Sequence, residues 1–353
     1  MATVPTYFKD FLSNIRMTKS QNDDCAKGHA VLRDRLANDD DLKDIVIDTF
    51  LQGSYKRHTA IKPVAGEGKS DVDVIVVTNL DHNKVSPSEA LERFHPFLKK
   101  HYAGKFRRQG RSWGIELSYV DLDLVITSAP SEVAKEEYRS FYLLNEAQLI
   151  NVKSEWQSEP LLIPDREVGR WDKTHPLAQI LATLEKNRNT NGHYINVVKS
   201  IKWWRKALHP KPKHPKSYPL EHFIWTVCPN SIQSVAEGIV QTFEHIRDDY
   251  GWYVTCNAKP RLPDHGVPEH DVFARVTNAD FAAFYELVCA AATTARDAYN
   301  EQDVKKSVLK WRELFGDEFP SPPTDSSDGD DNSGSGGFTQ RQAPSIIGGG
   351  RFA

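Results

Sequence analysis

The sequence predicts a mixed α+β protein in which a sheet-forming N-terminal half precedes a helical C-terminal half. Short β-branched and alternating apolar runs, typical of strands, lie before residue 130. From Thr174 to residue 300, apolar residues recur every three or four positions, as in helices. From residue 320 the chain is rich in Ser, Gly, Asp and Pro. We therefore expect a sheet domain with N-terminal helices over 1–170, a helical domain over 171–319 and a disordered tail over 320–353.

The composition is that of a soluble globular protein and excludes two function classes. Hydrophobic residues make up 39% and charged residues 26% of the 353 positions. A net charge of −3 argues against a general nucleic-acid coat protein, which would be basic. No apolar run is long enough to span a membrane, and the first residues lack a signal-peptide pattern. The four scattered cysteines form no CxxC pair, so we expect reduced thiols in the cytoplasm.

The N-terminal half is expected to mix helices and strands. Helical spacing covers residues 6–37, and a β-branched run at 45–51 is a strand that turns into a short helix at Gly53-Ser54. The remaining predictions are a strand at 71–77, a helix beginning at Pro87, one or two strands within 112–127, and a loop at 164–171 that crosses between the two parts.

The C-terminal half is expected to contain helices at 174–188, 194–208, 218–228, 232–249 and 278–300. Between the last two lie His265, His270 and Asp271, whose spacing matches no established metal motif. We interpret that segment as a loop with local hydrogen bonds.

Two carboxylates on one strand are the strongest chemical signal. Asp71 and Asp73 project from the same face, about 6.6 Å apart along the chain. Carboxylates on a buried strand are costly without a cation, and together with Asp123 on a later strand they suit two Mg²⁺ ions. The alternative is a solvated strand face. Asp121 competes for the third position, but Asp123 is favoured because an apolar run follows it, as one follows Asp73.

Three further segments can hold a nucleotide. The turn Gln52-Gly53-Ser54 allows backbone N–H groups to approach phosphate, although a plain strand-to-helix turn is the alternative. Lys199 and Lys202 share one face of a basic helix, which is either solvated or a source of positive charge for a triphosphate. Ser217 and Tyr218 begin the next helix. Ser217 either contacts phosphate or caps the helix, and Tyr218 either stacks on a base or packs in the core.

Together these segments resemble one known family. The stretches QGSYKRHTAIKP, SDVDVIVVT and YVDLDLVITSAP, with LLIPDREVGRWDKTHPLAQI, NGHYINVVKSIKWWRK and KSYPLEHFIW later in the chain, resemble the bacterial cGAS/DncV-like nucleotidyltransferases (CD-NTases). The ending GGGRFA resembles clade D of that family. The resemblance covers roughly residues 5–315 and the extreme C-terminus.

The resemblance implies a polymerase-β-like mixed sheet facing an oligoadenylate-synthase-like helical domain, with the active site in the cleft between them. It implies joining of ATP, and often GTP, into a cyclic trinucleotide with two Mg²⁺ ions, or Mn²⁺, and no obligatory nucleic-acid template. By motif position Asp71, Asp73 and Asp123 are the metal ligands, and Gly53 and Ser54 hold phosphate. Lys202, Ser217 and Tyr218 match nucleotide-binding positions of the helical domain, although Ser217 replaces a glutamine.

The resemblance also implies a setting in antiphage (CBASS) operons, where a separate effector senses the product. In some of these systems an E1/E2-like partner conjugates the enzyme through its C-terminus, which here is Ala353. Three alternatives stay open: a linear product, a cyclic dinucleotide, and a nucleotide-binding scaffold that is conjugated through its tail. Base order, linkage, activation signal and oligomeric state are not predicted.

Overall fold

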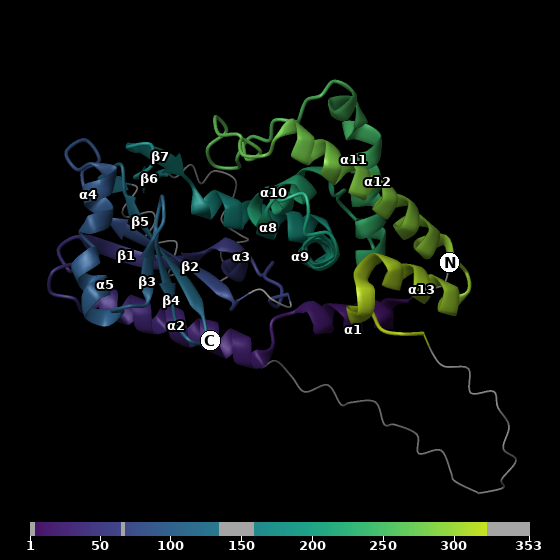
Figure 1. The fold of residues 1–353 in the computed structure, drawn as a ribbon, viewed down its shortest axis with the longest axis horizontal. Helices are drawn as coiled ribbons and strands as arrows, with labels where there is room; N and C mark the ends of the chain where they lie inside the picture. Colours follow the sequence, from purple (N-terminus) through teal and green to yellow (C-terminus); the bar gives the residue numbers. More distant parts are fainter. Residues whose placement is uncertain (1–3, 65–67, 134–158, 323–353) are drawn as a thin grey trace, which may run out of the picture. The chain divides into compact units, whose positions relative to one another are not determined.

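A mixed sheet forms the N-terminal half of the protein (Figure 1). The computed structural model describes residues 4–64, 68–133 and 159–322. Seven described strands run in the order β1-β2-β5-β4-β3, with β6 pairing β5 and β7. They are β1 (Val46–Gln52), β2 (Asp71–Thr78), β3 (Phe106–Arg108), β4 (Trp113–Glu116), β5 (Asp121–Ser128), β6 (Leu161–Asp165) and β7 (Arg170–Thr174). The central strands β2 and β5 are parallel, and the other pairings are antiparallel.

The two faces of the sheet pack against different helices because side chains alternate along β2. Val72, Val74 and Val76 enter a core shared with α2 (Lys19–Ala37), α4 (Pro87–Glu92) and α5 (His95–His101). Ile75 and Val77 point the other way, into a core shared with α8 (Pro176–Asn189). Asp71 and Asp73 have the parity of Ile75, so they lie on the face that α8 covers further along the strands.

A helical core forms the C-terminal half and includes the first helix of the chain. Its elements are α1 (Pro5–Ile15), α9 (Tyr194–Trp203), the π-helical turn η1 (Trp204–Leu208), α10 (Ser217–Val227), α11 (Val235–Thr255), α12 (Asn278–Asn300), α13 (Val304–Phe315) and the 3₁₀ turn η2 (Gly316–Glu318). Phe8 and Phe11 of α1 pack against Phe315, whereas α2 contributes to the core of the sheet. The two N-terminal helices thus belong to different cores.

Most predicted elements are confirmed, and breaks within them have local causes. Residues 6–37 form two helices, because Thr18 begins α2 with a capping box that includes Gln21. The helix predicted from Pro87 is interrupted as well. Pro96 lies at the start of α5 and has no N–H to donate to a preceding turn, so α4 and α5 are separate.

The loop predicted at 164–171 is wrong, because this segment forms a β-hairpin. Strand β6 pairs with β7 in a register that runs from Leu161↔Thr174 to Asp165↔Arg170. The Asp165 carboxylate accepts the N–H groups of Glu167 and Val168. Gly169 supplies a φ of +68° at the turn. Pro164 and the turn residues hide the strands from a pattern search, because prolines are depleted in sheets.

The predicted tail, with Ala353, lies outside the described residues except for its first positions. The chain divides into a unit of residues 1–322 and a second unit of residues 323–353. Among the described helices, none combines the length and the apolar character that crossing a membrane requires.

Candidate active site

Three of the predicted carboxylates converge at the start of the parallel strands β2 and β5. The register pairs Asp73 with Asp123 and Asp71 with Asp121. One carboxylate oxygen from each of Asp71, Asp73 and Asp123 lies within 4.8 Å of the others. Oxygens this close can share divalent cations, which bind carboxylates at about 2.0–2.6 Å.

The electrostatics of the three acids show charge that the protein itself leaves uncompensated. Desolvation, followed by the charges of Asp73 and Asp123, raises the pKa of Asp71 to about 8. Burial and the charge of Asp123 raise the pKa of Asp73 to about 6, although Arg57 opposes this shift. Burial also raises the pKa of Asp123, against a hydrogen bond from Gln109. In the described part of the chain no ion pair within 4.0 Å reaches these three acids.

The structure separates Asp123 from its competitor Asp121. Gln109 Nε2 donates a hydrogen bond of 2.9 Å to Asp123 Oδ1, which orients that carboxylate toward the cluster. Asp121 instead lies 3.7 Å from Lys69 Nζ, at a partly exposed position. Asp123 therefore completes the carboxylate cluster, and Asp121 is a neighbour with a cation of its own.

The predicted phosphate turn lies directly against the acids. Gln52 ends β1 opposite Asp73, and Gly53 and Ser54 begin the short helix α3 (Gly53–Lys56). Gly53 has a φ of +72°, and a Cβ at this position would lie 1.8 Å from Asp73 Oδ2. Only glycine tolerates both the backbone conformation and the contact, so the turn approaches Asp73 as closely as the chain allows.

A second charged cluster joins the turn to the helical half. Glu221 of α10 accepts hydrogen bonds from Arg57 Nη2 at 3.1 Å, Thr59 Oγ1 at 2.8 Å and Lys202 Nζ at 2.7 Å. Lys202 Nζ also donates to the carbonyl oxygen of Thr59 at 3.0 Å. Burial disfavours the charge of Glu221, but Lys202 and Arg57 outweigh it and hold the pKa of Glu221 below its ordinary value. We call Glu221, Arg57, Thr59 and Lys202 the buried bridge.

The buried bridge determines where the structure places Lys202. Its side chain is 4% exposed, and its charge is paired with Glu221. Lys202 therefore holds α9 against the segment that follows the phosphate turn. Lys199, one turn earlier, has a pKa lowered to about 8 by burial and by the positive charges of Arg16 and Lys202.

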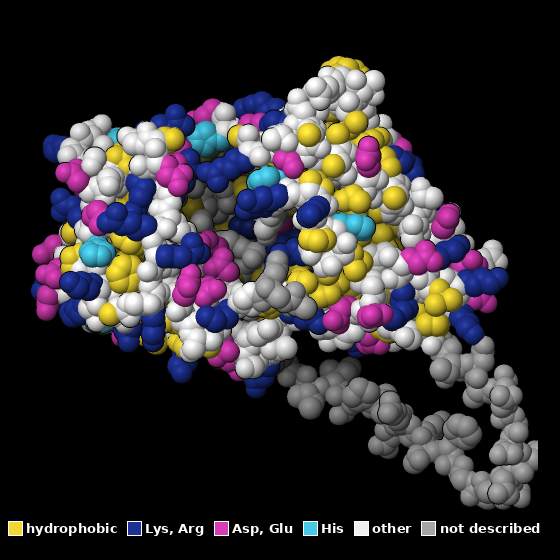
Figure 2. All heavy atoms as spheres, viewed as in Figure 1, with side chains coloured by type: hydrophobic (Ala, Val, Ile, Leu, Met, Phe, Trp, Pro, Cys, Tyr) yellow, Lys and Arg dark blue, Asp and Glu magenta, His cyan; other side chains and the backbone are white. Residues whose placement is uncertain are grey.

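Ser217 and Tyr218 begin α10 beside the turn. The ring of Tyr218 lies 5.2 Å from Arg57 Cζ, and its hydroxyl donates to Asp264 Oδ2 at 2.8 Å. Ser217 Oγ lies 3.4 Å from Glu221 Oε1, and Ser217 lines a cavity of about 300 Å³. The charged residues that line this basic pocket are all cationic: Lys202, Arg205, Lys206, Lys213 and Lys216. Figure 2 shows Lys and Arg side chains gathered around a hollow in the middle of the visible face.

Four residues that shape the site were missed in the sequence: Arg57, Gln109, Glu221 and Asp264. Glu221 carried a usable signal, since a single acid within the apolar run YPLEHFIW predicts a buried partner. The loop interpretation of residues 265–271 is confirmed, because Asp271 accepts the N–H groups of Leu262 and Phe273 and pairs with Lys259. In the described residues the only group of side chains able to hold a metal is the cluster of three acids.

The cluster fits a divalent metal on the chemistry of its donors. Three carboxylates with no other ligand type suit hard cations such as Mg²⁺ or Mn²⁺. Their pKa values are raised by desolvation first and by mutual repulsion second, and a divalent cation would compensate both effects.

Comparison with known proteins gives relatives along nearly the whole chain. The family described as Second Messenger Oligonucleotide or Dinucleotide Synthetase domain matches residues 1–132. A cyclic AMP-AMP-GMP synthase from Enterobacter hormaechei subsp. hoffmannii is 45% identical over 371 aligned positions, which cover 96% of each chain. A cyclic AMP-AMP-AMP synthase from an Acinetobacter species is 32% identical and covers 90% of this chain and 86% of its own.

Solved structures with low sequence identity share the fold. CdnC of Escherichia coli MS115-1, in a complex with HORMA-deltaN, superposes with a TM-score of 0.64 at 15% identity over 90% of this chain and 98% of its own. The Bradyrhizobium diazoefficiens CD-NTase CdnG, in complex with GTP, superposes with a TM-score of 0.64 at 12% identity, over 88% of this chain and 94% of its own. These likenesses confirm the predicted α+β nucleotidyltransferase architecture. With relatives this similar over nearly all of its length, the chain belongs to the bacterial cGAS/DncV-like nucleotidyltransferases (CD-NTases) of CBASS antiphage systems.

Proposed function

We propose that this enzyme joins ATP and GTP into a cyclic trinucleotide, with cyclic AMP-AMP-GMP as the product. The observation that carries the proposal is the cluster of Asp71, Asp73 and Asp123 against the Gly53 turn, in a chain 45% identical to a cyclic AMP-AMP-GMP synthase. A probable cyclic AMP-AMP-GMP nucleotide synthase from Salmonella paratyphi B is 44% identical, whereas the cyclic AMP-AMP-AMP synthase is 32% identical. The mixed product is therefore favoured.

The reaction repeats one bond exchange three times. A ribose hydroxyl of one nucleotide attacks the α-phosphorus of the next, the bond to the β-phosphate breaks, and pyrophosphate leaves with release of one proton. Two such steps build a linear trinucleotide, and the third closes the ring. Divalent metal at the acids, when bound, lowers the pKa of the attacking hydroxyl and neutralises charge on the departing pyrophosphate.

The residues of the chain contribute binding and orientation. Asp71, Asp73 and Asp123 would hold Mg²⁺, as two ions, or Mn²⁺ in its place. Gln52, Gly53 and Ser54 present backbone N–H groups and a hydroxyl to the phosphates. The basic pocket beside Ser217 accommodates the rest of the polyphosphate through the lysines of its lining, among them Lys213 and Lys216. Lys202 also lines this pocket but is paired with Glu221, and Lys199 lies one turn earlier on α9, so these two lysines support nucleotide binding at longer range. Tyr218 stacks on a base, with its ring held by Asp264 and Arg57.

A product analysis tests the proposal. Purified protein is incubated with Mg²⁺ and all four NTPs, and the products are treated with phosphatase and weighed by mass spectrometry. A phosphatase-resistant species with the mass of cyclic AMP-AMP-GMP is expected, and it should be absent with Asp73→Asn. A phosphatase-sensitive chain would assign a linear product. Release of no pyrophosphate from a folded protein would contradict the proposal altogether.

We further propose that a separate effector senses the product and that an E1/E2-like partner conjugates the enzyme through Ala353. The support is the family's setting and the sequence of the last residues. Mass spectrometry of the C-terminal peptide, from cells that hold the whole operon, tests the conjugation. A branched peptide that disappears on deletion of Ala353 is expected, and an unmodified C-terminus in those cells contradicts the proposal.

A further inference from the structure

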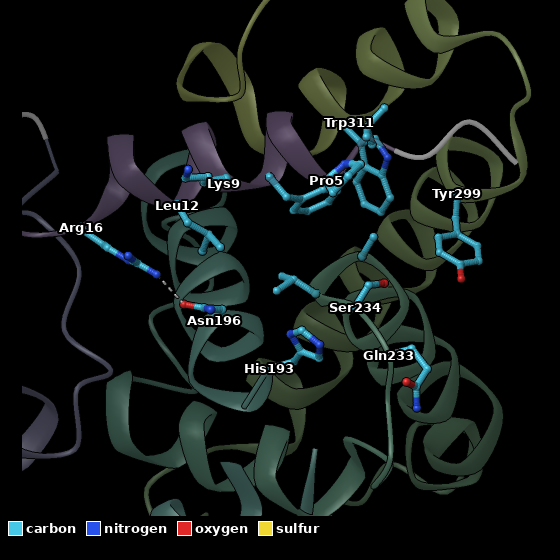
Figure 3. A pocket seen from close by; sticks show the side chains of 14 residues that line it. Pro5, Lys9, Leu12, Arg16, His193, Asn196, Gln233, Ser234, Tyr299 and Trp311 are labelled. Carbon is cyan, nitrogen blue, oxygen red and sulfur yellow. Dashed lines mark hydrogen bonds between the residues drawn. The ribbon is translucent and has the colours of Figure 1, made fainter. Parts of the chain in front are cut away.

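Another cavity, of about 490 Å³, lies among the helices of the C-terminal half (Figure 3). Its walls are α1, the N-terminal ends of α9 and α11, the end of α12, and α13. It shares no lining residue with the three acids, the phosphate turn or the basic pocket. Its volume lies within the range of about 300–1,000 Å³ that is typical of small-molecule sites.

The middle of this cavity is apolar and aromatic. Phe8 and Leu12 of α1 and Trp311 of α13 line it, and each is at least 95% buried. The rings of Phe8 and Trp311 meet edge to face at 4.9 Å, so they form one aromatic wall. Such a surface favours a planar apolar group of a ligand.

One end of the cavity is cationic. Lys9 of α1 and Arg16, which follows α1, line the cavity together with His193 and Asn196 at the start of α9. Figure 3 shows the Arg16 guanidinium directed at Asn196. Arg16 Nη2 donates to Asn196 Oδ1 at 3.0 Å, which fixes the guanidinium beside the opening. The lining contains no Asp or Glu. Among the ion pairs of the described residues, none involves Arg16 or Lys9.

Two helices direct their N-terminal ends at the same cavity. His193 precedes α9, and Ser234 caps α11, which is 21 residues long. At α11 the carboxylate of Glu237 accepts the N–H of Gln233 and offsets the partial positive charge of that helix end. The N-terminus of α9 has no acid in its first turn, so its partial positive charge adds to that of Arg16 and Lys9. An apolar middle, a cationic end and no acidic lining are therefore combined in one cavity.

We propose that this cavity binds a small amphipathic anion, whose planar aromatic group lies against the wall that Phe8, Leu12 and Trp311 form and whose carboxylate or phosphate meets Arg16. The site is separate from catalysis and does not depend on the proposed product. A carboxylate and a phosphate present the same charge and acceptor oxygens to Arg16, so the experiment distinguishes them.

The fluorescent aromatic anion 1-anilinonaphthalene-8-sulfonate (ANS) serves as the probe, with the full-length protein in EDTA. Saturable binding of one equivalent is expected. Arg16→Gln should weaken it about tenfold, the loss of one charge-assisted hydrogen bond, while the uncharged probe N-phenyl-1-naphthylamine binds unchanged. Ala236→Trp, which fills the cavity, should abolish binding of both probes. Arg93→Gln, an exposed arginine of the sheet half, is the matched control. Thermal unfolding checks that each variant is folded.

Competition then identifies the anionic group. Displacement of ANS by indole-3-acetate assigns a carboxylate, and displacement by phenyl phosphate assigns a phosphate. The proposal is overturned if ANS binding is not saturable, if neither competitor displaces it, or if folded Arg16→Gln and Ala236→Trp bind it as the wild type does. Asp73→Asn should bind ANS normally, and weaker binding by that variant would place the probe in the active site and contradict the proposal.

Discussion

Two charged clusters lie close together in this protein and differ in how their charge is balanced. Asp71, Asp73 and Asp123 gather three carboxylates with no ion pair among the described residues. The buried bridge surrounds the single carboxylate of Glu221 with two cations and a hydroxyl. The pKa values follow this difference, since those of the three acids are raised and that of Glu221 is lowered.

The comparison separates a ligand site from a structural connection. Where the protein balances a buried charge internally, the ion pairs hold two segments together. Glu221 in this way holds α9 against the residues that follow the phosphate turn. Charge that it leaves unbalanced is relieved from solution, by a proton or by a metal cation. The variants below perturb one cluster and leave the other intact.

Glu221→Gln should give the largest effect. It leaves Arg57 and Lys202 buried without a counter-charge, and breaking a buried pair in this way costs about 3–5 kcal/mol. Urea denaturation measures the loss. Glu269→Gln, which breaks the exposed pair with Lys173, is the control and should cost less than about 1 kcal/mol. Equal losses in the two variants would show that the buried bridge is not structural.

Asp73→Asn should lower the rate of pyrophosphate release at least ~100-fold, or about 2.7 kcal/mol, because metal charge stabilisation is lost. Asp121→Asn is the matched control on the paired strand, since its carboxylate has Lys69 as a partner. It should retain activity within about tenfold. A larger loss in Asp121→Asn than in Asp123→Asn would reverse the assignment of the third ligand.

These acids also show what the sequence predicts and what it does not. Side-chain alternation along a strand predicts that Asp71 and Asp73 share one face of β2, and that Asp121 and Asp123 share one face of β5. The choice of Asp123 over Asp121 depends on the parallel register and on Gln109, and strand pairing is a tertiary property. Glu221 and Arg57 are 164 positions apart, so no local pattern reveals their contact.

Lys202 illustrates the same limit. A basic helix next to two tryptophans predicts a charged face near phosphate, but it does not predict that one lysine is buried with a glutamate. The hairpin of β6 and β7 was missed for a related reason. Pairing between two short strands outweighs the low intrinsic strand propensity of Pro164 and the turn residues.

Gly53→Ala should reduce activity about tenfold or more. The new Cβ would meet Asp73 Oδ2 at 1.8 Å, so the turn and the carboxylate must separate. Gly192→Ala is the matched control, because Gly192 has a φ of +79° and nothing lies within 4 Å of its added Cβ. Thermal unfolding should show that both variants lose about 1 kcal/mol of stability, because alanine is strained at a positive φ. Steady-state assays should show a loss of activity in Gly53→Ala only.

The last prediction concerns stability against pH in EDTA. Asp71 has a folded pKa of about 8, above its ordinary value of 3.8, so the folded state binds the proton more tightly. Its contribution to stability is therefore present at low pH and is lost as the pH rises toward 8. Asp71→Asn should flatten the fall in urea midpoint between pH 5 and 8. A slope identical to that of the wild type would show that Asp71 is not perturbed.

Binding of Mn²⁺ tests most directly the claim that unbalanced charge marks the ligand site. Isothermal titration of wild type, Asp73→Asn and folded Glu269→Gln, each with a non-reactive ATP analogue, measures binding without catalysis. We expect Mn²⁺ to bind wild type and Glu269→Gln alike, and Asp73→Asn at least about tenfold more weakly. Equal affinity in all three proteins would contradict the assignment of the three acids as the metal site.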